Sequence, residues 1–324
     1  MPAGSPPAAR TPKDPRLTTL LLTHKACLDH ATPEGHPERA DRLRAIAQIL
    51  GHPPFDPLLR EEAPEADPAL ATLVHPEAYV DEIVGLSPAE GRVPIDADTS
   101  MSPGTLRAAL IGVGAACRAV DAVMAGEATN AFCATRPPGH HAETARAMGF
   151  CFFNNAAIAA RHAQRAHGAE RVAIVDFDVH HGNGTQDIFW SDPTVLYAST
   201  HQMPLYPGSG AVTETGVGNI VNAPLRAGDG GPAFREAMTA RVLPALEAFS
   251  PDLVVISAGF DAHRDDPLGG LHLEERDFSW ATAEMMAIAA RTAKGRIVSV
   301  LEGGYDLMGL ARSTAAHVLT LMKA

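Results

Sequence analysis

The run RVAIVDFDVHHGNG, which begins at Arg171, contains three residues that could bind a metal, namely Asp176, Asp178 and His180. The branched apolar residues before Asp176 are typical of a strand buried on both faces. Alternate residues of a strand share a face, which predicts that the two aspartates and the histidine point to one side. Burying even one neutral polar group without a partner costs roughly 2–7 kcal/mol. A bound cation would compensate, so the pattern predicts a metal site at the end of a central strand.

A third metal ligand is expected in the loop after the strand predicted over 253–257, which contains three aspartates. Asp266 is the candidate, because Pro267 stiffens the chain that follows it. Two carboxylates and one imidazole, with one position left open, are typical of a catalytic zinc site. Iron, manganese or cobalt would suit the same ligands. Without a third ligand, an Asp-x-His pair is better explained by a hydrogen bond between its members.

Two adjacent histidines, His140 and His141, follow Gly139 at the end of another predicted strand. Asp176 on the metal strand and Asn183 in the turn after it are available to orient them. A histidine with one nitrogen fixed by an acceptor presents the other nitrogen to a substrate, as general acid–base catalysis requires. Two surface histidines are the alternative for a bare His-His pair.

Tyr305 follows two glycines after the last predicted strand, in LEGGYD. Glycine lets the backbone approach a site closely, and the phenol could then donate a hydrogen bond to an oxyanion opposite the metal. A single Gly-Gly-Tyr is otherwise typical of a turn with an aromatic ring packed on the surface. Its place at a strand end, like the other clusters, favours the functional interpretation.

The elements that must position these residues alternate between strand and helix from Asn130 onward. This order predicts an α/β fold with a parallel sheet covered by helices on both faces, and a ligand site beyond the carboxyl ends of the strands. A first strand is expected over 17–23, and 51–72 is expected to be a connection. Because the polar clusters interleave along the chain, we predict one domain over 17–324 after a flexible tail over 1–16.

Composition excludes several classes of protein. The net charge of −12 argues against a partner that is a nucleic acid. The four cysteines form no Cys-x-x-Cys pair, so neither a disulfide framework nor a cysteine zinc site is indicated. No apolar run is long enough for a membrane span and no signal peptide is evident, which predicts a cytoplasmic protein with no membrane partner.

Six motifs, in their order and spacing, resemble the zinc-dependent histone deacetylase superfamily, and within it the class II deacetylases and the bacterial histone deacetylase-like amidohydrolases. They are RPPGHHA (136–142), GFCFFNN (149–155), DFDVHHGNGTQ (176–186), YPGSG (206–210), SAGFDAHRDDPLGG (257–270) and LEGGYD (301–306). The resemblance covers roughly residues 18–323. It implies an arginase-like, three-layer α/β/α fold around a central parallel sheet of about eight strands.

The resemblance implies one catalytic zinc ion, bound by Asp178, His180 and Asp266. Of the two adjacent aspartates in the 257–270 motif, the one directly before the proline matches the family ligand, which selects Asp266 over Asp265. A structural potassium ion is also implied, near Asp176, Asp178, His180, Ser199 and Thr200.

The catalytic residues follow from the same resemblance. His141 matches the general base and acid, and His140 matches its electrostatic partner. Asp176 and Asn183 match the residues that orient the two histidines, and Tyr305 matches the tyrosine that stabilises the transition state.

The substrate channel is implied by four further positions. Phe150 and Tyr206 match the aromatic residues that line the acyl channel, with Gly149 beside them. Asp98 matches a rim position that binds the substrate backbone, and Arg39 matches an arginine near the family's internal acetate exit.

The implied reaction is zinc-dependent hydrolysis that removes acetyl or other short acyl groups from acylated lysine, in a protein or peptide, or from a similar small amine. An acetylpolyamine or another small acetyl-amide is the alternative substrate, but Leu268 stands where polyamine-selective relatives carry a glutamate. A catalytically silent acyl-lysine-binding module would lack an expected residue, and none is missing. An arginase-like dimetal enzyme would need more acidic ligands near His140. The sequence leaves a homo-oligomer open.

Overall fold

Eight parallel strands form one sheet in the computed structural model, which describes residues 19–323. In spatial order the strands are β2-β1-β5-β10-β9-β6-β7-β8. Their bounds are β1 Thr19–Thr23, β2 Leu59–Glu62, β5 Asn130–Cys133, β6 Val172–Asp176, β7 Val195–Gln202, β8 Ile220–Leu225, β9 Leu253–Ala258 and β10 Ile297–Leu301. The predicted parallel α/β sheet is confirmed. The tail predicted over 1–16 lies outside the described residues.

The central strands are apolar and buried because helices cover both of their faces. Every residue of β6 (VAIVD), β9 (LVVISA) and β10 (IVSVL) is buried, as is typical of a parallel strand in the middle of a sheet. Edge strand β2 (LREE) is mostly exposed and pairs with β1 alone. The residues of β2 were expected to be a connection, because a charged, solvent-facing strand lacks the apolar signal.

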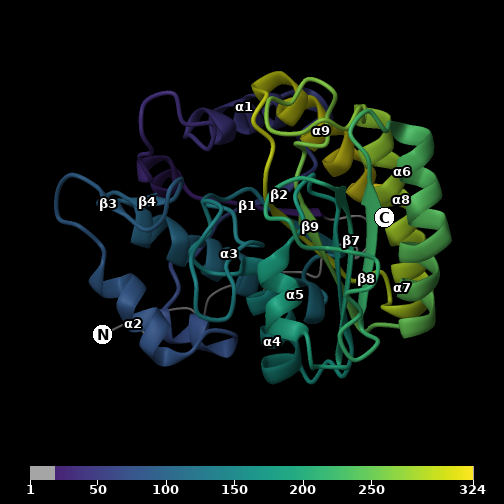
Figure 1. The fold of residues 1–324 in the computed structure, drawn as a ribbon. Coiled ribbons are helices and arrows are strands. Elements are labelled where there is room, and N and C mark those ends of the chain that lie inside the picture. The colour runs from purple at the N-terminus through teal and green to yellow at the C-terminus, as the bar shows by residue number, and fades with distance from the viewer. Residues whose placement is uncertain (1–18, 324) are drawn as a thin grey trace, which may run out of the picture.

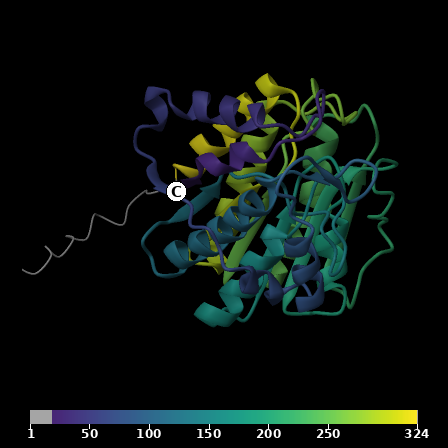
Figure 2. The same ribbon diagram turned by 90° about the vertical axis from the view of Figure 1, so that its left-hand side faces the viewer.

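Helices form a layer on each side of the sheet (Figure 1). One layer contains α3 (Thr105–Met124), α4 (Asn155–His167) and the short α5 (Asn183–Phe189), and α2 (Glu77–Gly85) packs outside it. The other layer contains α1 (Asp41–Leu50), α6 (Gly231–Ala237), α7 (Leu243–Phe249), α8 (Glu275–Thr292) and α9 (Leu307–Leu321). Figure 2 shows α1 beside α9, so the first and last helices of the described chain pack together. This is the expected three-layer architecture.

Two segments differ from the helix predictions. The helix expected over 232–249 is interrupted by a π-helical turn, Met238–Val242, between α6 and α7. Pro244 lies in the first turn of α7, and a proline in a helix has no N–H to donate to the preceding turn, which favours a local change of winding. The polar loop expected over 87–104 contains a small antiparallel pair, β3 (Val93–Pro94) and β4 (Ser100–Met101).

All carboxyl ends of the parallel strands lie at the same edge of the sheet. The loops after β5, β6, β7, β9 and β10 therefore meet there, and these loops carry the polar clusters of the sequence. Among residues 19–323, no helix has both the length and the apolarity needed to cross a bilayer.

Candidate active site

The end of β6 positions the first two candidate metal ligands. The strand ends at Asp176, and Asp178 and His180 lie in the bend that follows rather than on the strand itself. Asp176 Oδ1 accepts a hydrogen bond from the Asp178 N–H at 3.0 Å, and Asp178 Oδ1 accepts one from the His180 N–H at 2.9 Å. These carboxylate-to-backbone bonds shape the bend. The predicted strand alternation was therefore wrong beyond Asp176, because the aspartates replace the ladder bonds with local ones.

Asp178, His180 and Asp261 form one buried group of possible ligands. One ligand atom from each lies within 4.8 Å of the others. His180 Nδ1 is 3.1 Å from Asp178 Oδ1 and 3.2 Å from Asp261 Oδ2. Asp261 Oδ2 is buried without a hydrogen-bond donor in suitable geometry. An orphaned carboxylate oxygen beside an imidazole and a second carboxylate is the environment that a divalent cation fits.

The electrostatics of this group also favour a cation. Burial, and then the negative charge of Asp178, raise the pKa of Asp261 to about 7. Burial opposes ionisation of Asp178 as well, but His140 and His180 hold the pKa of its carboxyl below the usual value. Two buried carboxylates this close repel each other, and a positive ion between them removes the repulsion.

Asp266, predicted as the third ligand, lies outside the group whose donor atoms approach one another within 4.8 Å, and its role as a ligand stays a prediction. Its Oδ2 accepts hydrogen bonds from the N–H groups of Tyr305 at 2.7 Å and Asp306 at 3.1 Å. Its Oδ1 accepts one from the Leu268 N–H at 3.0 Å. Both oxygens accept backbone N–H groups, but Oδ1 accepts only one and keeps a free lone pair, so these bonds do not exclude a metal. Asp261, rather than Asp266, lies in the buried group with Asp178 and His180. Asp261 is the first acidic residue after β9, a signal that could have identified it.

The two adjacent histidines have separate partners, as predicted. His140 Nδ1 lies 3.0 Å from Asp176 Oδ2, and His141 Nδ1 lies 2.7 Å from Asn183 Oδ1. Burial opposes a charge on His140, but Asp178 and Asp176 raise its pKa well above the usual value. Burial, and then the charges of His140 and His180, lower the pKa of His141 well below its usual value. His141 is therefore the neutral histidine of the pair and suits a general base.

Glu302 is a buried functional residue that was not predicted from the sequence. It follows β10, and its Oε2 accepts hydrogen bonds from the N–H groups of Gly139 at 2.7 Å and His140 at 3.1 Å. Burial raises the pKa of its carboxyl to about 7, although His140 opposes this. Glu302 holds the loop that carries both histidines, and its place at a strand end was the available signal.

Tyr305 lies over a buried arginine. Arg42 Cζ is 4.9 Å from the centre of the Tyr305 ring, and Arg42 Nε donates to the Gly304 carbonyl at 2.6 Å. Arg39, expected near an internal exit, is half exposed and lies 3.6 Å from Asp41, and the exit itself stays a prediction. Burial raises the pKa of Tyr305 well above its usual value, although Arg42 opposes this. The phenol keeps its proton at neutral pH and can donate a hydrogen bond.

These side chains meet at a pocket of about 250 Å³. It is lined by Asp98, His141, Gly149, Phe150, His180, Leu205, Tyr206, Leu268 and Tyr305. The pocket includes all four residues predicted for substrate binding. The Phe150 ring centre is 6.0 Å from that of Tyr305, and the Tyr206 ring centre is 5.2 Å from that of His141. The pocket is therefore aromatic along its walls and polar at its base.

The wall carrying Phe150 depends on unusual backbone geometry. Gly149 and Phe150 both have positive φ, +55° and +69°. A Cβ on Gly149 would lie 2.5 Å from His141 Cδ2, so a side chain would displace the histidine. On the rim, Thr99 Oγ1 donates to Asp98 Oδ1 at 2.9 Å and accepts from the Phe150 N–H at 3.0 Å. Asp98 is thereby linked to the channel wall.

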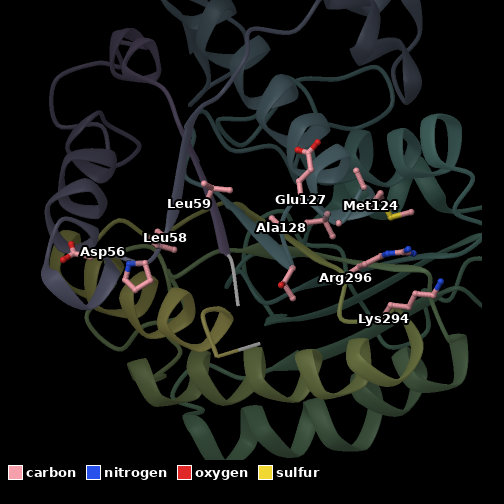
Figure 3. Close-up of a pocket in the computed structure, with 13 residues that line it drawn as sticks. Asp56, Leu58, Leu59, Met124, Glu127, Ala128, Lys294 and Arg296 are labelled. Atoms are coloured by element: carbon pink, nitrogen blue, oxygen red, sulfur yellow. The ribbon is translucent and has the colours of Figure 1, made fainter. Parts of the chain in front are cut away.

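A larger cavity, about 760 Å³, lies at the opposite edge of the sheet, where β2, β5 and β10 begin. Its lining includes Leu58, Leu59, Met124, Glu127, Ala128, Lys294 and Arg296 (Figure 3). Parallel sheets bind ligands beyond their carboxyl ends. The smaller pocket, with the histidines and carboxylates, is therefore the candidate active site.

Comparison with known proteins identifies the family of the chain. A family described as "Histone deacetylase domain" matches residues 36–321. The chain is 43% identical over 278 residues to the "Histone deacetylase-like amidohydrolase" of Pseudomonas aeruginosa, covering 84% of this chain and 73% of that protein. It is 35% identical over 356 residues to "Type-2 histone deacetylase 2" of Dictyostelium discoideum, covering 95% of this chain but 21% of that protein.

A solved structure gives the same result for the fold. The crystal structure of the HDA15 HD domain superposes with a TM-score of 0.90 at 38% sequence identity, covering 95% of this chain and 89% of that one. Together with the strand-end site, these matches show that the chain belongs to the histone deacetylase family and is a hydrolase that acts on amide bonds.

Proposed function

We propose that this chain is a zinc-dependent deacetylase that removes acetyl or other short acyl groups from acylated lysine side chains. The observation that carries the proposal is that the buried Asp178–His180–Asp261 group reaches, through His180, the pocket that a neutral His141 and Tyr305 also line. Each reacting group that amide hydrolysis needs has a candidate there. The matching family supports deacetylation as the reaction class.

Asp178, His180 and Asp261 would bind the zinc ion. Zinc, when bound, supplies a Lewis acid for the amide carbonyl and lowers the pKa of water from about 15.7 toward 7. The buried, unpartnered Oδ2 of Asp261 and the two further donor atoms near it suit this ion. Three protein ligands leave room for substrate and water, as in other catalytic sites.

His141 would move the protons. Its Nδ1 is bound to Asn183 Oδ1, which leaves Nε2 free to accept a proton from the attacking water. The same nitrogen then gives its proton to the leaving amine, so lysine is released as the acyl group departs as acetate. His140, held by Asp176, supplies a neighbouring positive charge that favours the neutral form of His141.

Tyr305 would stabilise the tetrahedral oxyanion that forms during attack. Its phenol lies at the base of the pocket with His141 and His180. Arg42 beneath the ring and the Asp266 bonds to its backbone hold the tyrosine in place. Loss of one oxyanion donor typically lowers the rate about 10²–10³-fold.

The pocket shape favours a long, neutral acyl-amine substrate. Phe150 and Tyr206 provide aromatic surface for the methylene groups of a lysine side chain. Asp98, exposed on the rim, could accept a hydrogen bond from a substrate backbone N–H. Leu268 adds an apolar side chain to the lining, at a position where a carboxylate would have bound the extra positive charge of a polyamine.

A substrate panel tests the proposal. Acyl-lysine peptides of increasing acyl length, small acetyl-amides and acetylpolyamines would be incubated with zinc-loaded protein, and released acetate and amine would be measured. We expect the acetyl-lysine peptides to be the best substrates by kcat/KM. Binding of these peptides without product release would contradict the proposal. The potassium ion, the cytoplasmic location and a homo-oligomer stay predictions from the sequence.

A further inference from the structure

Asn183 lies between His141 and a carboxylate on the far side, Glu143. Asn183 Oδ1 is 2.7 Å from His141 Nδ1, and Asn183 Nδ2 is 2.7 Å from Glu143 Oε1. The sulfur of Met148 lies 3.4 Å from the same Nδ2. Glu143 is thus connected to the candidate general base through one amide group.

The chemistry of the three groups fixes the direction of both hydrogen bonds. A carboxylate only accepts, so the amide nitrogen of Asn183 must face Glu143 and its oxygen must face His141. That oxygen also only accepts, so His141 Nδ1 must carry the proton. His141 Nε2 is then the nitrogen with the free lone pair. Without Glu143, the amide could turn over and offer an N–H to Nδ1, which would stabilise the other tautomer.

Glu143 is held in a position from which it can orient the Asn183 amide. Its N–H donates to the Arg146 carbonyl at 2.9 Å, within the loop that leads to the channel wall. The next residue, Thr144, is anchored to Asp187 Oδ2 by its N–H at 2.9 Å and its hydroxyl at 2.6 Å. The side chain is half-buried and borders a cavity of about 300 Å³ that also contacts Asn183. Its carboxylate is therefore fixed behind the active site without being part of the substrate pocket.

We propose that Glu143 is a positioning residue, which sets the tautomer of His141 by orienting the Asn183 amide. The role rests on the proposed function, in which His141 Nε2 accepts a proton from water. Glu143 contacts neither the substrate pocket nor the ligand group, so its effect on the reaction passes through Asn183.

Exchanging donor and acceptor tests the role of Glu143. Glu143→Ala should lower kcat by about ten- to a hundredfold, the usual cost of losing a group that orients an active-site histidine, with KM and zinc content unchanged. Asn183→Asp alone places a second carboxylate next to that of Glu143, and the two carboxylates repel each other. Adding Glu143→Gln to it provides an amide donor for the new carboxylate, so the double variant should be about tenfold faster than Asn183→Asp.

Asp187→Asn is the matched control, because it removes a carboxylate that anchors the same loop but forms its side-chain hydrogen bonds with Thr144 and not with Asn183. Combined with Asn183→Asp, it should give no rescue. The proposal is overturned if Glu143→Ala keeps the wild-type kcat, if the Glu143→Gln double variant is no faster than Asn183→Asp, or if Asp187→Asn rescues equally well.

Nitrogen NMR of ¹⁵N-histidine-labelled protein separates this inference from the proposed function, because it needs no turnover. In the zinc-loaded wild type, His141 should show a protonated Nδ1 and an unprotonated Nε2, and Glu143→Ala should shift the population toward the other tautomer. An unchanged tautomer in Glu143→Ala would overturn the role of Glu143, whatever the enzyme's activity. An inactive wild type with the predicted NMR change would contradict only the proposed reaction.

Discussion

Asp266 Oδ2 lies 2.7 Å from the backbone nitrogen of Tyr305, so an aspartate predicted to bind the metal holds the backbone of the proposed catalytic tyrosine. Asp261, five residues earlier in the sequence, faces Asp178 and His180. The two aspartates of one loop therefore have different contacts, Asp261 with the proposed ligand group and Asp266 with the backbone of Tyr305. Variants of each should fail in different ways.

Asp261→Ala should lose zinc, and Asp266→Ala should keep it. Removing Asp261 takes away one of three ligands, and the remaining aspartate and histidine bind a divalent ion weakly. Removing Asp266 leaves the ligand group intact but frees the Tyr305 N–H, so kcat should fall with zinc still at one per chain. Metal analysis after dialysis distinguishes them. Full zinc content in Asp261→Ala, or its loss in Asp266→Ala, would contradict this assignment.

Tyr305→Phe should lower kcat about 10²–10³-fold, because the phenol is the proposed oxyanion donor. The aromatic ring remains, so packing on Arg42 and the walls of the pocket should be little changed. Zinc content, KM and the free energy of unfolding serve as controls. A variant that turns over at the wild-type rate would remove Tyr305 from the mechanism.

Gly149→Ala should inactivate the enzyme by displacing His141. The new Cβ would lie 2.5 Å from the imidazole, and φ at this position is +55°. Gly126→Ala is a matched control, because Gly126 also has a positive φ, +73°, but a Cβ added there would meet no atom within 4 Å. Both variants should lose about 1 kcal/mol of stability from backbone strain, and Gly149→Ala should lose more because of the clash with His141. Only Gly149→Ala should lose kcat, and equal activity in the two would refute the steric argument.

His317 should make the fold sensitive to acid. It is fully buried between Thr282 and Ser299, and burial lowers its pKa from 6.5 to about 3. Below about pH 6.5 the unfolded chain therefore takes up a proton that the folded chain does not. The stability that is present above this pH is lost as the pH falls toward 3, by at most about 1.4 kcal/mol per pH unit.

Urea unfolding at several pH values between about 4 and 7 measures this effect. His317→Gln should show a flatter dependence of the unfolding free energy on pH than the wild type. His52→Gln, which changes an exposed histidine, should keep the wild-type slope. Parallel curves for His317→Gln and the wild type would show that His317 is not responsible.

The sheet and much of the site could be predicted because their signals are local. Runs such as VAIVD and LVVISA are recognisable as buried strands, and polar residues directly after them had to meet at one edge. The pairs His140–Asp176 and His141–Asn183 follow from that meeting. Strand β2 could not be recognised, because its charged residues face water and its position depends only on pairing with β1.

The identity of the proposed third ligand, and that of the buried arginine, depend on how the loops fold in three dimensions. Asp261 and Asp266 share one loop, and only its path decides which carboxylate turns toward His180 and which accepts backbone N–H groups. Arg39 lies just before α1 and Arg42 in its first turn, and only packing shows that Arg42 is the buried one. A sequence motif gives residue types at these positions but not the direction of their side chains.

The central claim is most directly tested by measuring zinc content and acetate release on the same preparations, with an acetyl-lysine peptide as substrate. The protein would be stripped by chelation and titrated with zinc, alongside Asp261→Ala. We predict that acetate release rises in proportion to zinc up to one ion per chain and stays at background in Asp261→Ala. Full activity in metal-free protein, or one bound zinc per chain without acetate release, would contradict the account.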